Sequence, residues 1–220
     1  MKLEAVLWDM DGVLIDSMDR HARAWLTVAG ELEMFDIDEL DIYRREGEKG
    51  EVSARDFLKA HEIMPTRKRI ERFLARKEDI FSQMGPAMPF PRAEQVLEDV
   101  AGYGLPMALV TGTSRQELES VLPGNLKAYF RVIVTGDSVR HGKPGPEPYL
   151  KAALGLGVDP GRCLVIENAP YGLRSAKAAG CIAAVVPTSL PHDELPGADF
   201  LLDGIEQVPE LLDRLISERA

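Results

Sequence analysis

Residues 3–17 read LEAVLWDMDGVLIDS, and the change of character at Asp9 decides how the rest of the chain is interpreted. The residues before it are mostly apolar, whereas aspartate and glycine are poor strand residues, so we predict a buried strand that ends at Asp9. Asp11 follows two positions later, with Gly12 directly after it. Two carboxylates this close repel each other, and burial adds to the cost. The pattern therefore predicts a bound cation at the end of this strand.

The composition of the chain limits the class of protein. Its 220 residues suffice for one sizeable core, alone or with a smaller appended domain. A hydrophobic content of 45% is ordinary for a globular protein, and the formal net charge of −10 argues against a nucleic-acid partner. No apolar run approaches the length of a membrane span, and the amino-terminal segment lacks the features of a signal peptide. We expect a cytoplasmic monomer with neither nucleic acid nor membrane as a partner.

The two cysteines, Cys163 and Cys181, each lie at the edge of an apolar, strand-like run. In a reducing compartment such residues are typically buried free thiols. We therefore expect neither a disulfide nor a cysteine metal site.

From about Leu105 onward, strand-like and helix-like segments alternate. The strand-like segments are PMALVT, VIVTG, CLVIEN, IAAVV and DFLL, and the helix-like ones are SRQELESVL, PEPYLKAALGLG, APYGLRSAKAAG and QVPELLDRLI. Several strands are apolar throughout, which suits a parallel sheet covered by helices on both faces. The repeated order predicts an α/β fold with a doubly wound, Rossmann-like parallel sheet. Gly157 and Gly180 are expected to end their helices.

The stretch between the first strand and this region has a different, helical pattern. Its segments are SMDRHARAWLTVAGEL, IDELDIYRREG, SARDFLKAHEI and TRKRIERFLARKEDIFSQM. An apolar stripe that includes Trp25 recurs at helical spacing in the first segment, so Trp25 is assigned to a core. The run GPAMPFP at residues 85–91 breaks the helical pattern. We predict an inserted all-helical domain over residues 17–85 and an α/β core formed by residues 1–16 and 86–220.

Polar residues follow four of the predicted strands, at the point where each strand ends. The four clusters are Asp9 with Asp11, Thr111 with Thr113 and Ser114, Asp137 with Lys143, and Glu167 with Asn168. Ligands of open parallel sheets bind beyond the carboxyl ends of the strands, so we expect these clusters to converge. Carboxylates suit Mg²⁺, whereas a lysine, a hydroxyl and turn N–H groups suit a phosphate dianion. The sequence therefore predicts a magnesium and phosphate site.

In this order the clusters resemble the haloacid dehalogenase-like hydrolase superfamily, and most closely its branch of β-phosphoglucomutase-like and phosphoglycolate phosphatase-like proteins. The matching motifs are DMDGVLIDS at residues 9–17, Thr111 at the end of an apolar strand, GKPGPEPY from Gly142 to Tyr149, and ENAPYG from Glu167 to Gly172. The resemblance covers nearly the whole chain, and the helical insert stands where this branch carries its cap domain.

The resemblance implies a role for each motif residue. Asp9 would be the nucleophile that forms an aspartyl-phosphate, and Asp11 would be the general acid and base. Lys143 and Thr111 would stabilise negative charge on the phosphoryl group. The implied Mg²⁺ site consists of Asp9, the backbone carbonyl of Asp11, Glu167 and Asn168. The expected function is a Mg²⁺-dependent phosphatase for a small phosphorylated metabolite, in particular a sugar phosphate.

Asn168 departs from the family pattern, which usually has aspartate there. An amide oxygen can still coordinate, so one expectation is weaker Mg²⁺ binding with a larger share carried by Glu167. The alternative is that Asn168 only caps the helix that follows, with Pro170 in its first turn.

Five residues are candidates for substrate contact, each with a structural alternative. The candidates are Gly112, Thr113, His21, Lys49 and Lys77. Thr113 and Ser114 could instead cap a helix. His21 matches a histidine of the β-phosphoglucomutase pattern, but it could equally lie at the edge of the apolar stripe. Lys49 lies in the loop REGEKGE and could be an ordinary surface residue. Lys77 lies in the segment ARKED, whose charge pattern is typical of a solvated helix face. Asp16 and Ser17 are assigned as helix caps rather than catalytic groups.

Three other functions compete with the phosphatase. A phosphomutase would pass the phosphoryl group to a second hydroxyl instead of water. A phosphonoacetaldehyde hydrolase would need a Schiff-base lysine in the cap, for which Lys49 is the candidate. A non-catalytic binding protein would follow if Asn168 had disabled the metal site, but the presence of Asp9, Asp11 and Lys143 argues against it.

Overall fold

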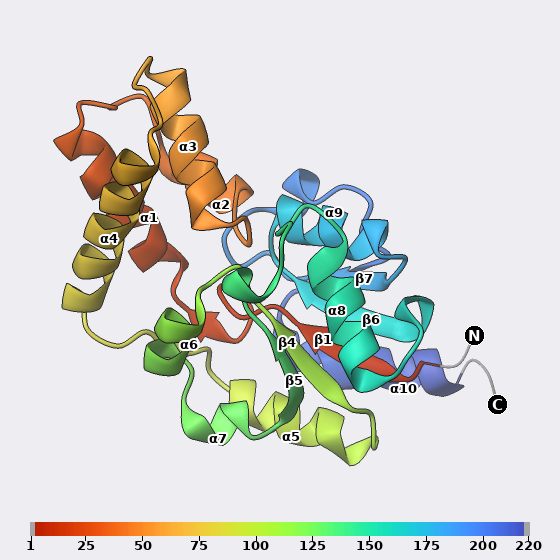
Figure 1. The fold of residues 1–220 in the computed structure, drawn as a ribbon. Helices are drawn as coiled ribbons and strands as arrows, with labels where there is room; N and C mark the ends of the chain where they lie inside the picture. The colour runs from red at the N-terminus through yellow and green to blue at the C-terminus, as the bar shows by residue number, and fades with distance from the viewer. Residues whose placement is uncertain (1–2, 218–220) are drawn as a thin grey trace.

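The computed structural model describes residues 3–217, and its centre is a six-stranded parallel sheet. In spatial order the strands are β5 (Phe130–Val134), β4 (Met107–Val110), β1 (Ala5–Trp8), β6 (Cys163–Glu167), β7 (Ile182–Val185) and β8 (Phe200–Leu201). The first strand of the chain lies in the middle, so the chain winds outward in both directions from β1 (Figure 1). The predicted α/β fold with a Rossmann-like parallel sheet is therefore confirmed.

Helices cover both faces of the sheet, which explains why its central strands are apolar throughout. On one face lie α8 (Glu147–Leu156) and α9 (Pro170–Ala178); on the other lie α5 (Ala93–Gly102) and α10 (Val208–Ser217), with α6 (Arg115–Val121) and α7 (Gly124–Lys127) nearby. Every residue of β1, β4 and β6 is buried. Successive strand residues enter opposite cores, because side chains alternate across a sheet. As expected, α8 ends at the left-handed Gly157.

The cap consists of four helices between two short paired strands. The helices are α1 (Met18–Glu31), α2 (Glu39–Arg44), α3 (Gly50–Ala60) and α4 (Arg67–Gln83), and the strands are β2 (Ile15–Asp16) and β3 (Met88–Pro89). Figure 1 shows these helices as a group of their own beside the sheet. The antiparallel β2–β3 pair joins the two chain crossings between cap and core. Sequence patterning did not predict this pair, since each strand has only two residues.

Trp25 forms the centre of the cap core. Its ring lies 5.8 Å from the Phe57 ring and 5.3 Å from the Phe73 ring, so it links α1 with α3 and α4. Aromatic pairs at such separations stabilise a core beyond the area that they bury. The assignment of Trp25 to a core is confirmed.

Short 3₁₀ turns complete the fold at η1 (Gly136–Ser138), η2 (Pro160–Arg162), η3 (His192–Glu194) and η4 (Ile205–Gln207). Cys163 and Cys181 are both buried and free, as predicted. Among residues 3–217, no helix has the length and apolar character that a bilayer crossing requires.

Candidate functional site

Asp9 and Lys143 form the buried centre of the site, at the carboxyl end of β1. The Lys143 ammonium lies 2.5 Å from Asp9 Oδ1, 2.7 Å from Glu167 Oε1 and 3.2 Å from the Val110 carbonyl oxygen. Burial lowers the pKa of Lys143, but the two carboxylates more than offset this and raise it overall. Burial raises the pKa of Asp9, and the attraction of Lys143 opposes that rise. The ammonium therefore holds one oxygen of Asp9 in a fixed direction.

Glu167 is held by the protein through both of its oxygens. Oε1 accepts hydrogen bonds from Lys143 and, at 2.6 Å, from the Tyr149 hydroxyl; Oε2 accepts from the Asn168 backbone N–H at 3.0 Å. The first turn of α9 leaves room for the carboxylate because it contains Gly172, where an added Cβ would lie 1.8 Å from Oε1. Glu167 thus orients Lys143, and Tyr149 and Gly172 in turn position Glu167.

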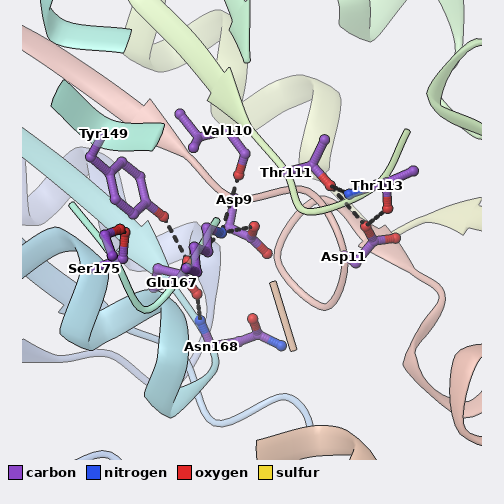
Figure 2. A network of polar contacts seen from close by, with 11 residues as sticks. Asp9, Asp11, Val110, Thr111, Thr113, Tyr149, Glu167, Asn168 and Ser175 are labelled. Atoms are coloured by element: carbon purple, nitrogen blue, oxygen red, sulfur yellow. Dashed lines mark hydrogen bonds and ion pairs between the residues drawn. The ribbon is translucent and has the colours of Figure 1, made fainter. Parts of the chain in front are cut away.

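Asp11 has a separate set of partners (Figure 2). The hydroxyl groups of Ser17, Thr113 and Thr111 donate to its carboxylate at 2.6, 3.1 and 3.3 Å. The His21 Nε2 lies 3.3 Å from Oδ1. Burial raises the pKa of Asp11, but the hydrogen bonds and the His21 charge prevail and lower it to about 2. In this conformation the surroundings of Asp11 therefore favour its carboxylate form.

The side chains of Ser17 and Thr113 cap no helix. Ser17 occupies the N-cap position of α1, as predicted, but its hydroxyl donates to Asp11 instead of capping the helix. Thr113 likewise bonds to Asp11, and it is Ser114 that caps α6 by accepting from the Glu117 N–H. Asp137 accepts hydrogen bonds from the Arg115 N–H and the Thr135 hydroxyl.

Asn168 and Asp9 present buried polar atoms that have no hydrogen-bond partner within the described part of the chain. These atoms are Asp9 Oδ2 and both side-chain heteroatoms of Asn168. The N-cap of α9 is Ala169, so the capping alternative for Asn168 is wrong. Gly12, at φ +79°, brings the Asp11 loop so close that a Cβ there would lie 2.0 Å from Asn168 Nδ2.

These unpartnered atoms fit a hard cation. A carboxylate oxygen and an amide oxygen are both suitable ligands for Mg²⁺, which keeps several waters and needs few protein groups. Residues 3–217 contain no group of three or more His, Cys, Asp or Glu side chains placed to hold a metal. At this site an amide, Asn168, stands beside the carboxylate of Asp9, and the Lys143 ammonium contacts both Asp9 and Glu167.

A cavity of about 270 Å³ lies above this site, between cap and core. The candidates His21, Lys49, Lys77, Gly112 and Thr113 all line it. His21 is buried and stacked on Phe81 at 4.5 Å between ring centroids, so it is not a surface residue. The structure therefore brings all five candidates to one cavity.

Both candidate lysines contact the core across this cavity. Lys77 is buried rather than solvated, and its ammonium lies 3.1 Å from Glu117 on α6 and 5.0 Å from the Phe81 ring centroid. Lys49 donates to the Val139 carbonyl oxygen at 2.8 Å. The prediction that the ARKED segment is a solvated face is wrong at Lys77, because α4 turns this residue toward the core.

Sequence reasoning missed the acidic residues of the cavity, and Glu46 stands out among them. Burial raises its pKa to about 7, with a further contribution from the negative charge of Asp11. Glu46 lies between α2 and α3 in the segment REGEKG. The only signal in the sequence was the flanking Gly47, which allows a tight backbone approach.

Comparison with known proteins gives a consistent result. The family model for haloacid dehalogenase-like hydrolases matches residues 3–180. Hexitol phosphatase A from Escherichia coli is 31% identical over 219 residues, covering 94% of each chain. The phosphorylated carbohydrates phosphatase from Thermotoga maritima is 34% identical over 183 residues, covering 81% of this chain and 82% of the relative. The crystal structure of beta-phosphoglucomutase from Clostridium difficile shares the fold, with a TM-score of 0.84, 22% identity and 98% of each chain covered.

Proposed function

The chain belongs to the haloacid dehalogenase-like hydrolase family, and we propose that it is a Mg²⁺-dependent phosphatase for a small phosphorylated carbohydrate. One observation carries this proposal: Lys143 fixes one oxygen of Asp9, while the other is buried and has no partner within residues 3–217. The carboxylate is thereby held in a fixed orientation for attack on phosphorus, and its unpartnered oxygen is left for a cation.

In the first step, Asp9 attacks the phosphorus atom and the bond from phosphorus to the substrate oxygen breaks. The products are an aspartyl-phosphate and the free alcohol, whose oxygen takes a proton from Asp11. Asp11 must first take that proton from solvent, because its surroundings favour the carboxylate. Lys143 and the backbone N–H groups around Gly112 stabilise the negative charge of the transferring group.

In the second step, Asp11 accepts a proton from water, and the resulting hydroxide attacks the phosphoryl group. The bond between phosphorus and Asp9 breaks, which releases phosphate and restores the carboxylate. The hydroxyl groups of Ser17, Thr111 and Thr113 keep Asp11 in position through both steps.

Asp9 Oδ2, the Asp11 backbone carbonyl and the Asn168 amide oxygen would hold Mg²⁺. When bound, the cation offsets the repulsion between the Asp9 carboxylate and the anionic phosphate. Glu167 would act on the cation without binding it directly, because both of its oxygens already accept hydrogen bonds from the protein.

The carbohydrate part of the proposal rests on relatives and on the cavity. Two relatives of at least 30% identity are named as phosphatases of hexitols and of phosphorylated carbohydrates. A cavity of about 270 Å³ suits a small molecule, and its mixture of lysine and carboxylate side chains can bind hydroxyl groups.

Phosphate release from a panel of hexitol phosphates, hexose phosphates and phosphoglycolate tests the proposal. We expect release that requires Mg²⁺ and that disappears in Asp9→Asn, with the fastest turnover on a carbohydrate phosphate. Product analysis on β-glucose 1-phosphate separates the alternative, because a phosphomutase would produce glucose 6-phosphate. A folded wild-type protein that releases phosphate from no compound would contradict the proposal.

A further inference from the structure

The core offers little free negative charge to a cation. Both oxygens of Glu167 are engaged by donors, and those of Asp11 accept hydrogen bonds from hydroxyl groups. Asn168 is neutral. Asp9 Oδ2 is the carboxylate oxygen that stays buried without a partner in the described structure. Since divalent-cation affinity follows the charge of the ligand set, this core alone is a weak site.

The cap brings further charge to this place through the cap loop, which comprises residues 46–49. Glu48 pairs with Lys143 in an isolated parallel bridge. A Cβ on Gly47 would lie 2.4 Å from Lys143 Cδ, and a Cβ on Gly112 would lie 2.6 Å from the Gly47 carbonyl oxygen. The loop backbone therefore contacts the catalytic lysine and the phosphate-binding turn directly. Glu46, next to Gly47, lines the cavity from the cap side.

Glu46 and Glu48 differ in their surroundings. Glu48 accepts hydrogen bonds from Arg45 at 2.9 Å and from Ser53 at 2.6 Å, so it is neutralised within the cap. Glu46 is partly buried and repelled by Asp11, with only partial compensation from His21 and Lys143. A carboxylate in that environment is stabilised by an additional positive charge.

We propose that Glu46 supplies, from the closed cap, the negative charge that Asn168 does not supply, so that core and cap hold the cation jointly. This inference rests on the proposed Mg²⁺-dependent function. It implies that cation binding and cap closure favour each other, because coupling between two equilibria is reciprocal.

Binding of Mn²⁺, measured by electron paramagnetic resonance without substrate, tests the inference independently of turnover. We expect Glu46→Gln to raise the Kd for Mn²⁺ by about tenfold, because it removes one ligand charge without changing the size of the side chain. The matched control is Glu48→Gln, which alters the same cap loop and should leave the Kd within about twofold of wild type.

Two further variants test whether the Mn²⁺ affinity depends on ligand charge and on the position of the cap loop, rather than on a general disturbance of the fold. Asn168→Asp restores a carboxylate in the core, so adding it to Glu46→Gln should return the Mn²⁺ affinity toward that of wild type. Gly47→Ala places a Cβ against Lys143 at φ +79°, which should push the cap loop away and weaken binding as Glu46→Gln does. The combined Glu46→Gln and Gly47→Ala variant should then lose less Mn²⁺ binding free energy than the sum of the losses in the two single variants.

The outcomes separate this inference from the proposed function. An unchanged Mn²⁺ Kd in folded Glu46→Gln would overturn the inference, and a raised KM in the same variant would then identify Glu46 as an acceptor for substrate hydroxyl groups. Normal Mn²⁺ binding without phosphate release would instead defeat the phosphatase proposal alone. A wild-type protein that binds no Mn²⁺ would overturn both.

Discussion

Lys143 and Asp9 are 134 residues apart in the sequence, yet the Lys143 ammonium lies 2.5 Å from Asp9 Oδ1 in the closed interior of the site. Both side chains are almost fully buried, and Glu167 completes the group as a second carboxylate on the same ammonium. A buried charge is tolerated only when it is paired, so each of the three depends on the others.

Lys143→Met should therefore lower stability as well as activity. The change leaves Asp9 and Glu167 buried without their cation, which costs about 3–5 kcal/mol for a buried pair. Urea unfolding followed by circular dichroism measures the loss. Lys177→Met is the control, because Lys177 forms an exposed pair with Asp199, and such pairs contribute about 0–1 kcal/mol. Equal losses in the two variants would contradict the prediction.

Gly172→Ala should reduce turnover strongly, because a Cβ there would lie 1.8 Å from Glu167 Oε1. The carboxylate would have to move away from Lys143 and Tyr149, and we expect kcat to fall by at least about tenfold, as for a misplaced catalytic group. Gly102→Ala is the matched control in another helix, since nothing lies within 4 Å of its added Cβ. If Gly172→Ala retains wild-type kcat, Glu167 does not need its observed position.

Removal of the buried cap lysine should affect substrate binding. Lys77→Met eliminates the ammonium that faces Glu117 across the cavity, and we expect KM for the best carbohydrate phosphate to rise about tenfold, the cost of one charged hydrogen bond. Steady-state kinetics measure this. Arg76→Met lies next to it on α4 but pairs with Glu31 and Asp79 inside the cap, so its KM should be unchanged. A raised KM in both variants would indicate a general effect on the cap.

Acid should destabilise the protein through Asp11. Its pKa is lowered from 3.8 to about 2 on folding, so the carboxylate contributes stability above pH 4 that is lost as the pH falls toward 2. The contribution is at most about 2 kcal/mol at neutral pH, from linkage between protonation and folding. Urea unfolding at a series of pH values should show a shallower decline for Asp11→Asn than for wild type. Parallel declines would mean that Asp11 is not stabilised as a carboxylate.

The two thiols should be unreactive in the folded protein. Burial raises the pKa of both Cys163 and Cys181 to about 12, and the thiolate is the reactive form. At pH 8 an aromatic disulfide reagent should therefore label neither cysteine before unfolding, and both in urea. Rapid labelling of the native protein would contradict the burial of these residues.

Much of the site could be predicted from where the apolar strands end. Asp9, Thr111 and Glu167 each follow or close a strand that is buried on both faces, and parallel strands bring their carboxyl ends to one edge. The predicted α/β fold followed from the same pattern. The helix α5 was not predicted, because it precedes the region in which strand-like and helix-like segments clearly alternate. The β2–β3 pair was not predicted, because strands of two residues are too short to show a hydrophobic period.

Hydrogen-bond partners could not be predicted in the same way. Ser17 was assigned as a helix cap, and Thr113 was given capping as the alternative to substrate contact, yet both hydroxyl groups donate to Asp11. The local sequence indicates that such a side chain needs a hydrogen-bond partner. Which group becomes the partner depends on which distant segment packs against it in the folded protein. The same limit applies to Lys77. The sequence correctly predicted a helix at this residue, but it placed the side chain on the solvated face.

By itself, the sequence determined which strands end in polar residues: Asp9 after the first strand, Lys143 in a loop and Glu167 at the end of a later strand of an α/β core. These positions are local features, since they depend on residue type and period, whereas the nucleophile role of Asp9 came from the family resemblance. Only the tertiary structure decided that Glu46 reaches the cavity lined by His21 and Thr113. The same holds for Glu167, whose two oxygens are engaged by Lys143, Tyr149 and the Asn168 backbone N–H. Those relations depend on how closely the cap loop and the core turns approach, and that distance is set by packing between segments far apart in the sequence.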